Sequence, residues 1–197
     1  MNISILGRGP LAEPLALLAE RAGHSVRRLT TAEPAQASDM GRLAILADTR
    51  EALAPMLAQI APAGARDIVF VDATTPSQDD RGRSADQRGG SDDASFDAAL
   101  PGSRVVRAFA SVPADALRAV VDAPPSQPGE RLGVPLAGDD AQARGVVGEF
   151  MRSIGVEPVD LGGLGNAQII EPGGALWGKA LSQVEMLEAV GWLSGDG

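Results

Sequence analysis

The chain has 197 residues, of which 44% are hydrophobic and 22% are charged, and its formal net charge at pH 7 is −9. This length and composition fit one globular α/β domain, and the acidic balance disfavours a general nucleic-acid binder. The sequence has no cysteine and no tyrosine, one histidine and one lysine, which excludes disulfides and thiolate chemistry and leaves few side chains for acid–base catalysis. With neither a basic leader nor an apolar run of about 18 residues, we expect a cytoplasmic protein without a membrane span.

A strand, a glycine-rich turn and a helix are predicted at the N-terminus. In residues 2–6, Ile3 and Ile5 alternate with polar residues, and Leu6 leads into Gly7-x-Gly9-x-x-Ala12. The apolar residues 15–18 are expected to belong to a helix. This arrangement is typical of a dinucleotide site, where a tight turn and a helix N-terminus hold the pyrophosphate. The alternative is an ordinary glycine-rich turn without a ligand. The residues expected to cradle the pyrophosphate are Gly7, Arg8, Gly9, Pro10 and Leu11.

Strands and helices alternate along the rest of the chain. Strands are expected at residues 25–29, 43–47, 67–71, 104–109, 132–137 and 156–161, and helices at 50–60, 113–121, 141–154 and 176–193. The polar stretch 77–95 is expected to be a long surface loop, either a lid or simply mobile, with a short helix at 96–100 and a loop at 162–165. This alternation predicts an α/β, Rossmann-type, doubly wound and mainly parallel sheet.

The domain organisation follows from the same order of elements. We expect a nucleotide-binding domain over residues 1–161 and a small helical C-terminal segment over 162–197. That segment packs either on the domain or on the partner of a homodimer.

The end of the second strand indicates which nucleotide is bound. NAD-preferring domains carry an acidic residue there, whereas this chain reads Arg27-Arg28-Leu29-Thr30-Thr31 with no carboxylate before Glu33. This pattern favours NADP, with Thr30 and Thr31 at the adenosine ribose or its phosphate. The alternative is two solvated arginines on an exposed strand. At the end of the third strand, Ala47 and Asp48 are predicted to line the nicotinamide ribose.

Two further acidic positions and the histidine are assigned structural roles. Asp139 or Asp140 is predicted to cap the helix that begins at residue 141, which is more probable for these side chains than catalysis. His24 follows Gly23 at a turn beside the second strand, where a general base would lie next to the adenosine half of a cofactor instead of the reacting ring. No metal site is predicted.

An ordered set of short motifs spans nearly the whole chain and resembles one family. The chain is similar to the NADPH-dependent reductases of the deazaflavin coenzyme F-420 and the related dinucleotide-binding proteins. The motifs are Ile5-Leu-Gly-Arg-Gly-Pro-Leu-Ala12, Ala22-Gly-His-Ser-Val26, Val71-Asp-Ala-Thr-Thr-Pro76, Val105-Val-Arg-Ala-Phe109, Val112-Pro-Ala-Asp-Ala-Leu117, Val134-Pro-Leu-Ala-Gly-Asp-Asp140, Ile154-Gly-Val-Glu-Pro-Val159, Asn166-Ala-Gln-Ile-Ile-Glu-Pro172 and Ala175-Leu-Trp177.

The resemblance implies hydride transfer between NADP(H) and a deazaflavin whose ring stacks on the nicotinamide at the carboxyl ends of the strands. Ring-to-ring hydride transfer requires positioning and the exclusion of water, and the cofactors carry the chemistry. No catalytic side chain is therefore expected. The resemblance places Ala73 at the cofactor and the second substrate beside Thr74, Ala110, Ala137 and Gly138.

The chain departs from the family at three points. Thr30-Thr31 stands where the family has Ser or Thr followed by Arg, so Arg8 is the candidate replacement for the phosphate clamp. Ala110 replaces a polar residue of the cleft, and the 77–95 loop is long and polar. These departures leave two alternatives: a non-catalytic nucleotide-binding or interaction module that has lost its acceptor site, and an NADPH-dependent flavin or ferric reductase.

Overall fold

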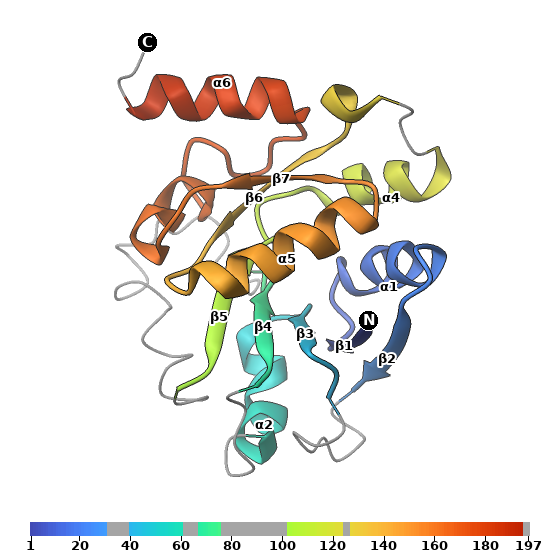
Figure 1. The fold of residues 1–197 in the computed structure, drawn as a ribbon. Coiled ribbons are helices and arrows are strands. Elements are labelled where there is room, and N and C mark those ends of the chain that lie inside the picture. The colour runs from blue at the N-terminus through green and yellow to red at the C-terminus, as the bar shows by residue number, and fades with distance from the viewer. Residues whose placement is uncertain (31–39, 61–66, 76–101, 124–126, 195–197) are drawn as a thin grey trace.

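The computed structural model describes residues 1–30, 40–60, 67–75, 102–123 and 127–194. Within these residues one seven-stranded sheet has the order β2-β1-β3-β4-β5-β6-β7 (Figure 1). The strands are β1 (Asn2–Leu6), β2 (Ser25–Leu29), β3 (Leu43–Leu46), β4 (Val69–Asp72), β5 (Arg104–Ala108), β6 (Gly133–Ala137) and β7 (Glu157–Asp160). The predictions for the loop at 77–95, the helix at 96–100 and Thr31 lie outside the described residues.

The sheet changes direction between β5 and β6. Strands β1 to β5 are parallel to one another, β6 is antiparallel to β5, and β7 is parallel to β6. The chain moves outward from β1 to β2 on one side and then returns to β3 on the other, which is the doubly wound arrangement. The predicted α/β, Rossmann-type, mainly parallel fold is therefore confirmed.

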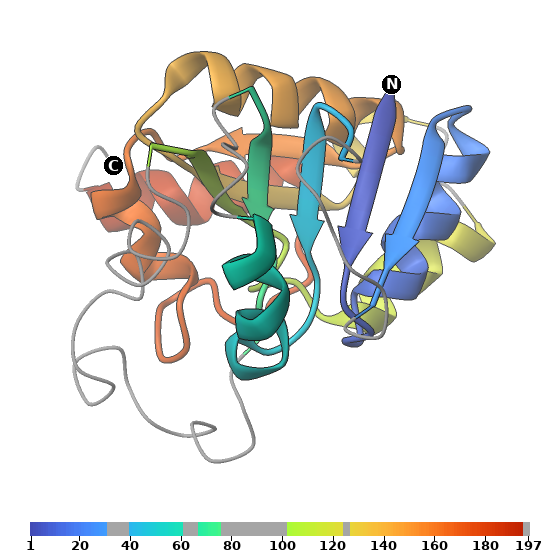
Figure 2. The same ribbon diagram turned by 90° about the horizontal axis from the view of Figure 1, so that it is seen from below.

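Helices cover both faces of the parallel strands (Figure 2). The helices are α1 (Ala12–Arg21), α2 (Arg50–Ile60), α4 (Ala114–Asp122), α5 (Ala141–Ser153) and α6 (Gln183–Ser194), with short 3-10 segments η4 (Pro128–Glu130) and η5 (Leu164–Ile170). Side chains such as Ile3 and Ile45 pack on one face against α1, α4 and α5, and Leu46 and Phe70 pack on the other against α2. Alternate residues of one strand thus enter two separate cores, as expected for a sheet buried on both sides.

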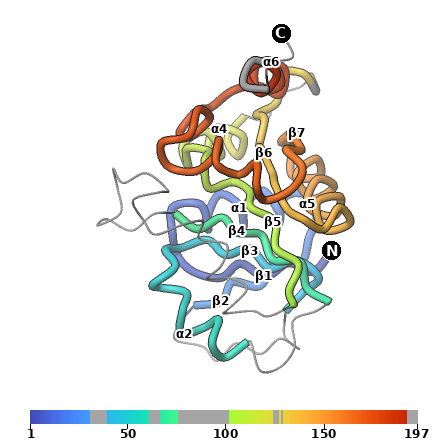
Figure 3. Tube along the Cα trace, turned by 90° about the vertical axis from the view of Figure 1, so that its left-hand side faces the viewer, coloured from blue at the N-terminus to red at the C-terminus, as the bar shows by residue number. Residues whose placement is uncertain are grey.

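The C-terminal part differs from the expected helix over 176–193. Helix α6 begins only at Gln183, and η5 replaces part of the loop expected at 162–165. Gly173 and Gly178 have φ values of 91° and 72°, which end helical geometry between η5 and α6. Ile170, Leu176 and Met186 join Val159 of β7 in a third core cluster, so this segment packs on β6 and β7. In Figure 3, α6 lies at the opposite end of the molecule from α2.

One residue at the end of β5 has an unusual backbone conformation. Phe109 has a φ of 66°, the only positive φ of a residue other than glycine within the described ranges. Its ring is fully buried and meets the ring of Phe150 edge-on, with centroids 6.3 Å apart. The left-handed backbone turns the chain out of the sheet directly before Ala110.

Among the helices that the structure describes, none is long and apolar enough to cross a membrane.

Candidate functional site

The glycine-rich turn between β1 and α1 has no room for side chains where it meets β3. Gly7 has a φ of 103°, and a Cβ added there would lie 2.5 Å from Cβ of Asp48. A Cβ on Gly9 would lie 2.7 Å from the carbonyl oxygen of Ala47. Real side chains do not approach this closely, so both positions require glycine for the contact between the two loops.

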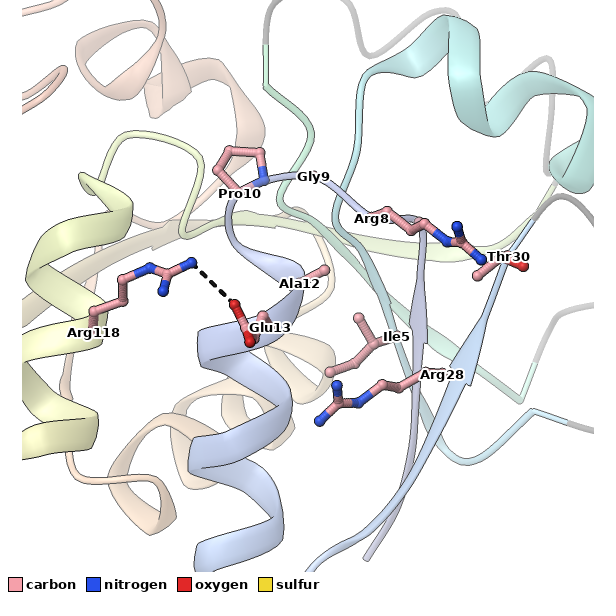
Figure 4. A pocket seen from close by; sticks show the side chains of 10 residues that line it. Ile5, Arg8, Gly9, Pro10, Ala12, Glu13, Arg28, Thr30 and Arg118 are labelled. Carbon is pink, nitrogen blue, oxygen red and sulfur yellow. Dashed lines mark hydrogen bonds and ion pairs between the residues drawn. The ribbon is translucent and has the colours of Figure 1, made fainter.

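A pocket of about 450 Å³ opens beside this turn (Figure 4). It lies between the glycine turn, α1, the end of β2 and α4, and its volume is typical of a small-ligand site. Of the residues predicted to bind the cofactor, those that line it are Gly7, Arg8, Gly9, Pro10 and Thr30. The other lining residues are Ile5, Ala12, Glu13, Arg28 and Arg118.

The lining of the pocket is cationic, although the chain as a whole is acidic. Three arginines and one glutamate give it a formal charge of +2, whereas the chain carries −9. Arg118 pairs with Glu13 at 3.1 Å and Arg28 pairs with Glu20 of α1 at 3.2 Å. In Figure 4 the guanidinium of Arg8 extends toward Thr30 at the end of β2. A local excess of positive charge favours an anionic ligand such as a phosphate group.

Four of the predicted cofactor residues do not line this pocket. Leu11 is buried in the core at the start of α1, and Ala73 is buried directly after β4. Ala47 and Asp48 contact the glycine turn from the end of β3: the amide of Gly9 donates to the carbonyl of Ala47 at 2.8 Å. The amide of Arg8 donates to the Asp48 carboxylate at 2.7 Å. Their role at a nicotinamide ribose stays a prediction.

A buried ionic cluster lies at the carboxyl ends of β4 and β5. Nη1 of Arg107 is 2.8 Å from Oδ1 of Asp72, and its Nε and Nη2 donate to both carboxylate oxygens of Glu171 at 2.6 and 3.1 Å. Arg50 of α2 pairs with the other Asp72 oxygen at 3.0 Å, and the hydroxyl of Thr74 donates to Asp72 at 2.7 Å. The cluster joins the sheet, α2 and the segment that follows η5.

The charges in this cluster hold each other in the ionised state. Burial raises the pKa of Asp72, but Arg107, Arg50 and the hydrogen bonds from Thr74 outweigh it, so the net pKa lies below the ordinary value. Burial likewise lowers the pKa of Arg107, and Asp72 and Glu171 more than reverse that effect. Asp72 therefore stays a carboxylate and does not serve as a proton donor near neutral pH.

The residues predicted to face a second substrate lie just beyond the carboxyl ends of β4 and β5 and at the end of β6, and their role there stays a prediction. Thr74 belongs to the ionic cluster, and Ala110 lies buried just beyond β5. Ala137 pairs with Arg107 across the antiparallel β5–β6 ladder, and a Cβ on Gly138 would lie 2.9 Å from the carbonyl of Val105. Because β6 runs against β5, Ala137 lies beside Arg107 near the end of β5, and Gly138 lies one residue further toward the start of that strand. Close packing is what the structure shows at these two positions.

The acidic residues before α5 have the structural role that was predicted. Oδ1 of Asp140 accepts hydrogen bonds from the amides of Gln142 and Ala143 at 2.8 and 3.1 Å, so Asp140 caps the helix. Asp139 accepts from the amide of Leu164 at 2.9 Å. His24 donates to or accepts from the Ser153 hydroxyl at 2.7 Å and does not line the pocket. Within the described ranges, no group of three or more His, Asp or Glu residues could hold a metal ion.

The sequence did not predict that residues of α1 and α4 line the pocket together, or which arginine of β2 does so. Arg118 and Glu13 come from helices that are far apart in sequence, and α1 and α4 meet only in the folded chain. No spacing rule connects them. Arg28 was one of two adjacent arginines on β2, and the alternation of side chains along a strand predicted that only one could face a ligand. The structure places Arg28 in the pocket lining.

No protein-family model matches the chain, and no curated protein matches it in sequence. Solved structures do match its fold. A hypothetical protein, SMa0349, from Sinorhizobium meliloti superposes with a TM-score of 0.70 at 23% identity, over 92% of this chain and 95% of that one. A candidate F-420-dependent NADP reductase from Arthrobacter sp. FB24 has a TM-score of 0.66 at 20% identity, over 92% and 99% of the two chains.

A more distant match extends the comparison to a larger enzyme. Pyrroline carboxylate reductase from Plasmodium falciparum, whose structure has NADP bound, matches with a TM-score of 0.52 at 8% identity, over 82% of this chain and 57% of that one. At these identities the likeness establishes the fold alone, a Rossmann-type α/β domain.

Proposed function

We propose that this protein binds NADP(H) and transfers a hydride between NADPH and a deazaflavin acceptor of the coenzyme F-420 type. The observation that carries the proposal is the cationic pocket beside the glycine turn of a Rossmann-type sheet. The pocket is lined by three arginines in an acidic chain, and the turn has the two close approaches that require glycine. These features suit a dinucleotide whose phosphates carry several negative charges.

A preference for NADP over NAD rests on the end of β2. Arg28 and Thr30 line the pocket, and no carboxylate lies among its β2 residues that could bind a free ribose hydroxyl. Arg8 extends toward Thr30 (Figure 4). A guanidinium and a hydroxyl together match the donor requirement of a 2′-phosphate, because charge-assisted hydrogen bonds to phosphate are strong. Thr31 follows directly in the sequence and belongs to the same proposal.

The side chains around the site fit a reaction that the cofactors perform. NADPH supplies the hydride when it is bound, and the acceptor takes that hydride together with a proton from solvent. The protein must hold the two rings together and keep water out. Ala73 and Ala110, which follow β4 and β5, are small buried residues. The similarity to the Arthrobacter protein supports a deazaflavin acceptor, with Thr74, Ala137 and Gly138 completing its surroundings.

The C-terminal segment is the part of the chain through which we propose that a homodimer forms. Val184 and Leu187 of α6 are about half exposed, whereas Leu176 and Met186 of the same segment are buried in the cluster with β6 and β7. A division of the chain near residue 161 and a dimer formed through this segment both remain proposals.

A second candidate function is a nucleotide-binding module without hydride transfer. It is favoured by Ala110, whose side chain offers no hydrogen bond to a polar acceptor. A flavin or ferric reductase is the alternative within the enzyme class.

Titration of the protein with NADPH and with NADH by nucleotide fluorescence tests the binding proposal. We expect tighter binding of NADPH. The Arg28→Gln variant should weaken NADPH by about tenfold or more, because it removes a charged hydrogen bond, and should leave NADH nearly unchanged. Arg42→Gln removes the same charge at an exposed residue directly before β3, at the amino ends of the strands, and is the matched control. Equal effects of Arg28→Gln on both nucleotides would contradict the assigned phosphate contact.

Hydride transfer is tested by mixing NADPH and the protein with a deazaflavin, a flavin or a ferric chelate and following NADPH absorbance. Oxidation with the deazaflavin alone supports the proposed acceptor. Oxidation with a flavin or ferric chelate instead supports the alternative enzyme, and binding without oxidation supports the module.

A further inference from the structure

The amides of the glycine turn are occupied by the protein itself. Gly7 donates to the carbonyl of Leu29 at 2.9 Å, and Gly9 donates to the carbonyl of Ala47 at 2.8 Å. Between them, Arg8 donates to Oδ2 of Asp48 at 2.7 Å. Two of these acceptors are neutral carbonyls built into the sheet, whereas the third is a side-chain carboxylate. The carboxylate is the one acceptor of the three that rotation of a side chain can remove.

Asp48 is held at this place by contacts to three loops. Its Oδ1 accepts the amide of Thr49 at 2.8 Å, and its backbone carbonyl accepts the amide of Thr75 at 3.2 Å. Gly7 lacks a Cβ where one would lie 2.5 Å from Cβ of Asp48, and this is what lets the carboxylate reach the turn. The carboxylate thus contacts the same turn whose residues Gly7, Arg8 and Gly9 line the cationic pocket.

A carboxylate and a phosphate compete for the same kind of donor. Both accept short, charge-assisted hydrogen bonds from backbone amides, and the 2.7 Å distance at Arg8 is typical of such a bond. A dinucleotide in the pocket would bring its pyrophosphate to this turn. The negative charge of Asp48 then either leaves the Arg8 amide or stays and repels the phosphates.

We propose that Asp48 sets the affinity of this site for phosphate-bearing ligands: its carboxylate occupies the Arg8 amide in the free protein and opposes the pyrophosphate of the incoming cofactor. This inference rests on the proposed function. In this inference Asp48 weakens cofactor binding, whereas a residue that hydrogen-bonds the nicotinamide ribose would strengthen it. Removal of its charge should therefore tighten binding.

The test compares Asp48→Asn with the native chain. The Asn variant keeps an oxygen acceptor for the Arg8 amide and removes the charge, so the loop contact is preserved. We expect the Kd for NADPH and the Kd for inorganic pyrophosphate each to fall by about tenfold at low salt, with no change for adenosine, which has no phosphate. Glu149→Gln is the control, since Glu149 is exposed on α5 and the substitution changes the net charge equally. Asp48→Ala, checked for folding by thermal unfolding, is the second variant and should also tighten pyrophosphate binding.

The outcomes separate this inference from the proposed function. Unchanged or weaker NADPH binding by folded Asp48→Asn overturns the inference and leaves the proposed function standing. Equal tightening by Glu149→Gln also overturns it, because net charge alone would then explain the effect. Tighter pyrophosphate binding without any nucleotide binding supports the inference and overturns the proposed function. A lack of binding by every variant overturns both.

Discussion

Asp72 and Arg107 are register partners on the adjacent parallel strands β4 and β5, and they form an ion pair of 2.8 Å with both side chains almost wholly buried. Glu171 meets the other side of the Arg107 guanidinium with two hydrogen bonds. Arg107 is therefore the cation between two carboxylates, and it ties the C-terminal segment to the middle of the sheet. Charged side chains that are buried to this degree are tolerated only when each one has a partner of opposite charge.

Removal of Arg107 should strongly destabilise the protein. Arg107→Met leaves the buried Asp72 and the largely buried Glu171 without their shared partner, and such a change typically lowers the free energy of unfolding by about 3–5 kcal/mol. The measurement is urea unfolding at neutral pH. Arg118→Gln, which breaks the mostly exposed pair with Glu13, should cost only about 0–1 kcal/mol. A similar loss in both variants would argue against a special role for the buried cluster.

Stability should fall in acid because of Asp72. Its pKa is lower in the folded protein than in the unfolded chain, so its contribution is fully present above the unfolded pKa of about 3.9 and is lost as the pH falls through the lower folded value. Unfolding measured from about pH 6 down to about pH 3 should show this decline. Asp72→Asn should be less stable at neutral pH and should show a shallower acid dependence. If the free energy of unfolding of Asp72→Asn fell with pH as steeply as that of the native protein, other groups would be responsible for the loss of stability in acid.

An alanine at Gly9 should disrupt the turn. Its Cβ would lie 2.7 Å from the Ala47 carbonyl and 2.9 Å from Cα of Asp48, both of which are backbone atoms that cannot move aside easily. We expect lower thermal stability and loss of NADPH binding. Gly145→Ala is the matched control, because Gly145 lies within α5 with no atom near its added Cβ. That control should gain about 0.5–1 kcal/mol, the usual helix preference for alanine. Normal NADPH binding by Gly9→Ala would contradict the role given to the turn.

The Asp140 cap should contribute to stability in a separable way. Asp140→Ala removes the acceptor for two amides at the start of α5 and should lower the free energy of unfolding by about 1 kcal/mol. Asp140→Ser keeps a capping oxygen and should recover most of that loss. Chemical unfolding of the three proteins decides between a capping role and a purely electrostatic one, in which Ser would be as poor as Ala.

Local patterns were sufficient to predict most of the parallel sheet. The observed bounds of β2 and α2 agree with the predicted 25–29 and 50–60. Helix α2 has apolar side chains at helical spacing, and β2 begins just after the turn at Gly23. The polarity of Arg27 and Arg28, unusual in a buried strand, is explained by the position of β2 at the edge of the sheet.

The rest depended on contacts between distant segments. The late start of α6 reflects glycines whose conformations were not apparent from the apolar pattern of 176–193. Strand β6 runs antiparallel to β5, and a strand's direction is not encoded in its own residues. The contact between Asp48 and the Arg8 amide joins positions 40 residues apart. Sequence reasoning placed both residues near the cofactor but could not reveal that one occupies the other's amide.

Two requirements conflict at Phe109: its backbone conformation favours glycine, and its buried position requires a large apolar side chain. Glycine would relieve its left-handed backbone, which costs a residue with a side chain about 1–2 kcal/mol, but loss of a buried phenyl ring costs about 3–5 kcal/mol. The ring therefore outweighs the strain, and few residue types satisfy both requirements. Any substitution at the neighbouring buried Ala110 that is meant to change the acceptor should therefore keep Phe109, because its left-handed backbone sets the direction in which the chain leaves β5.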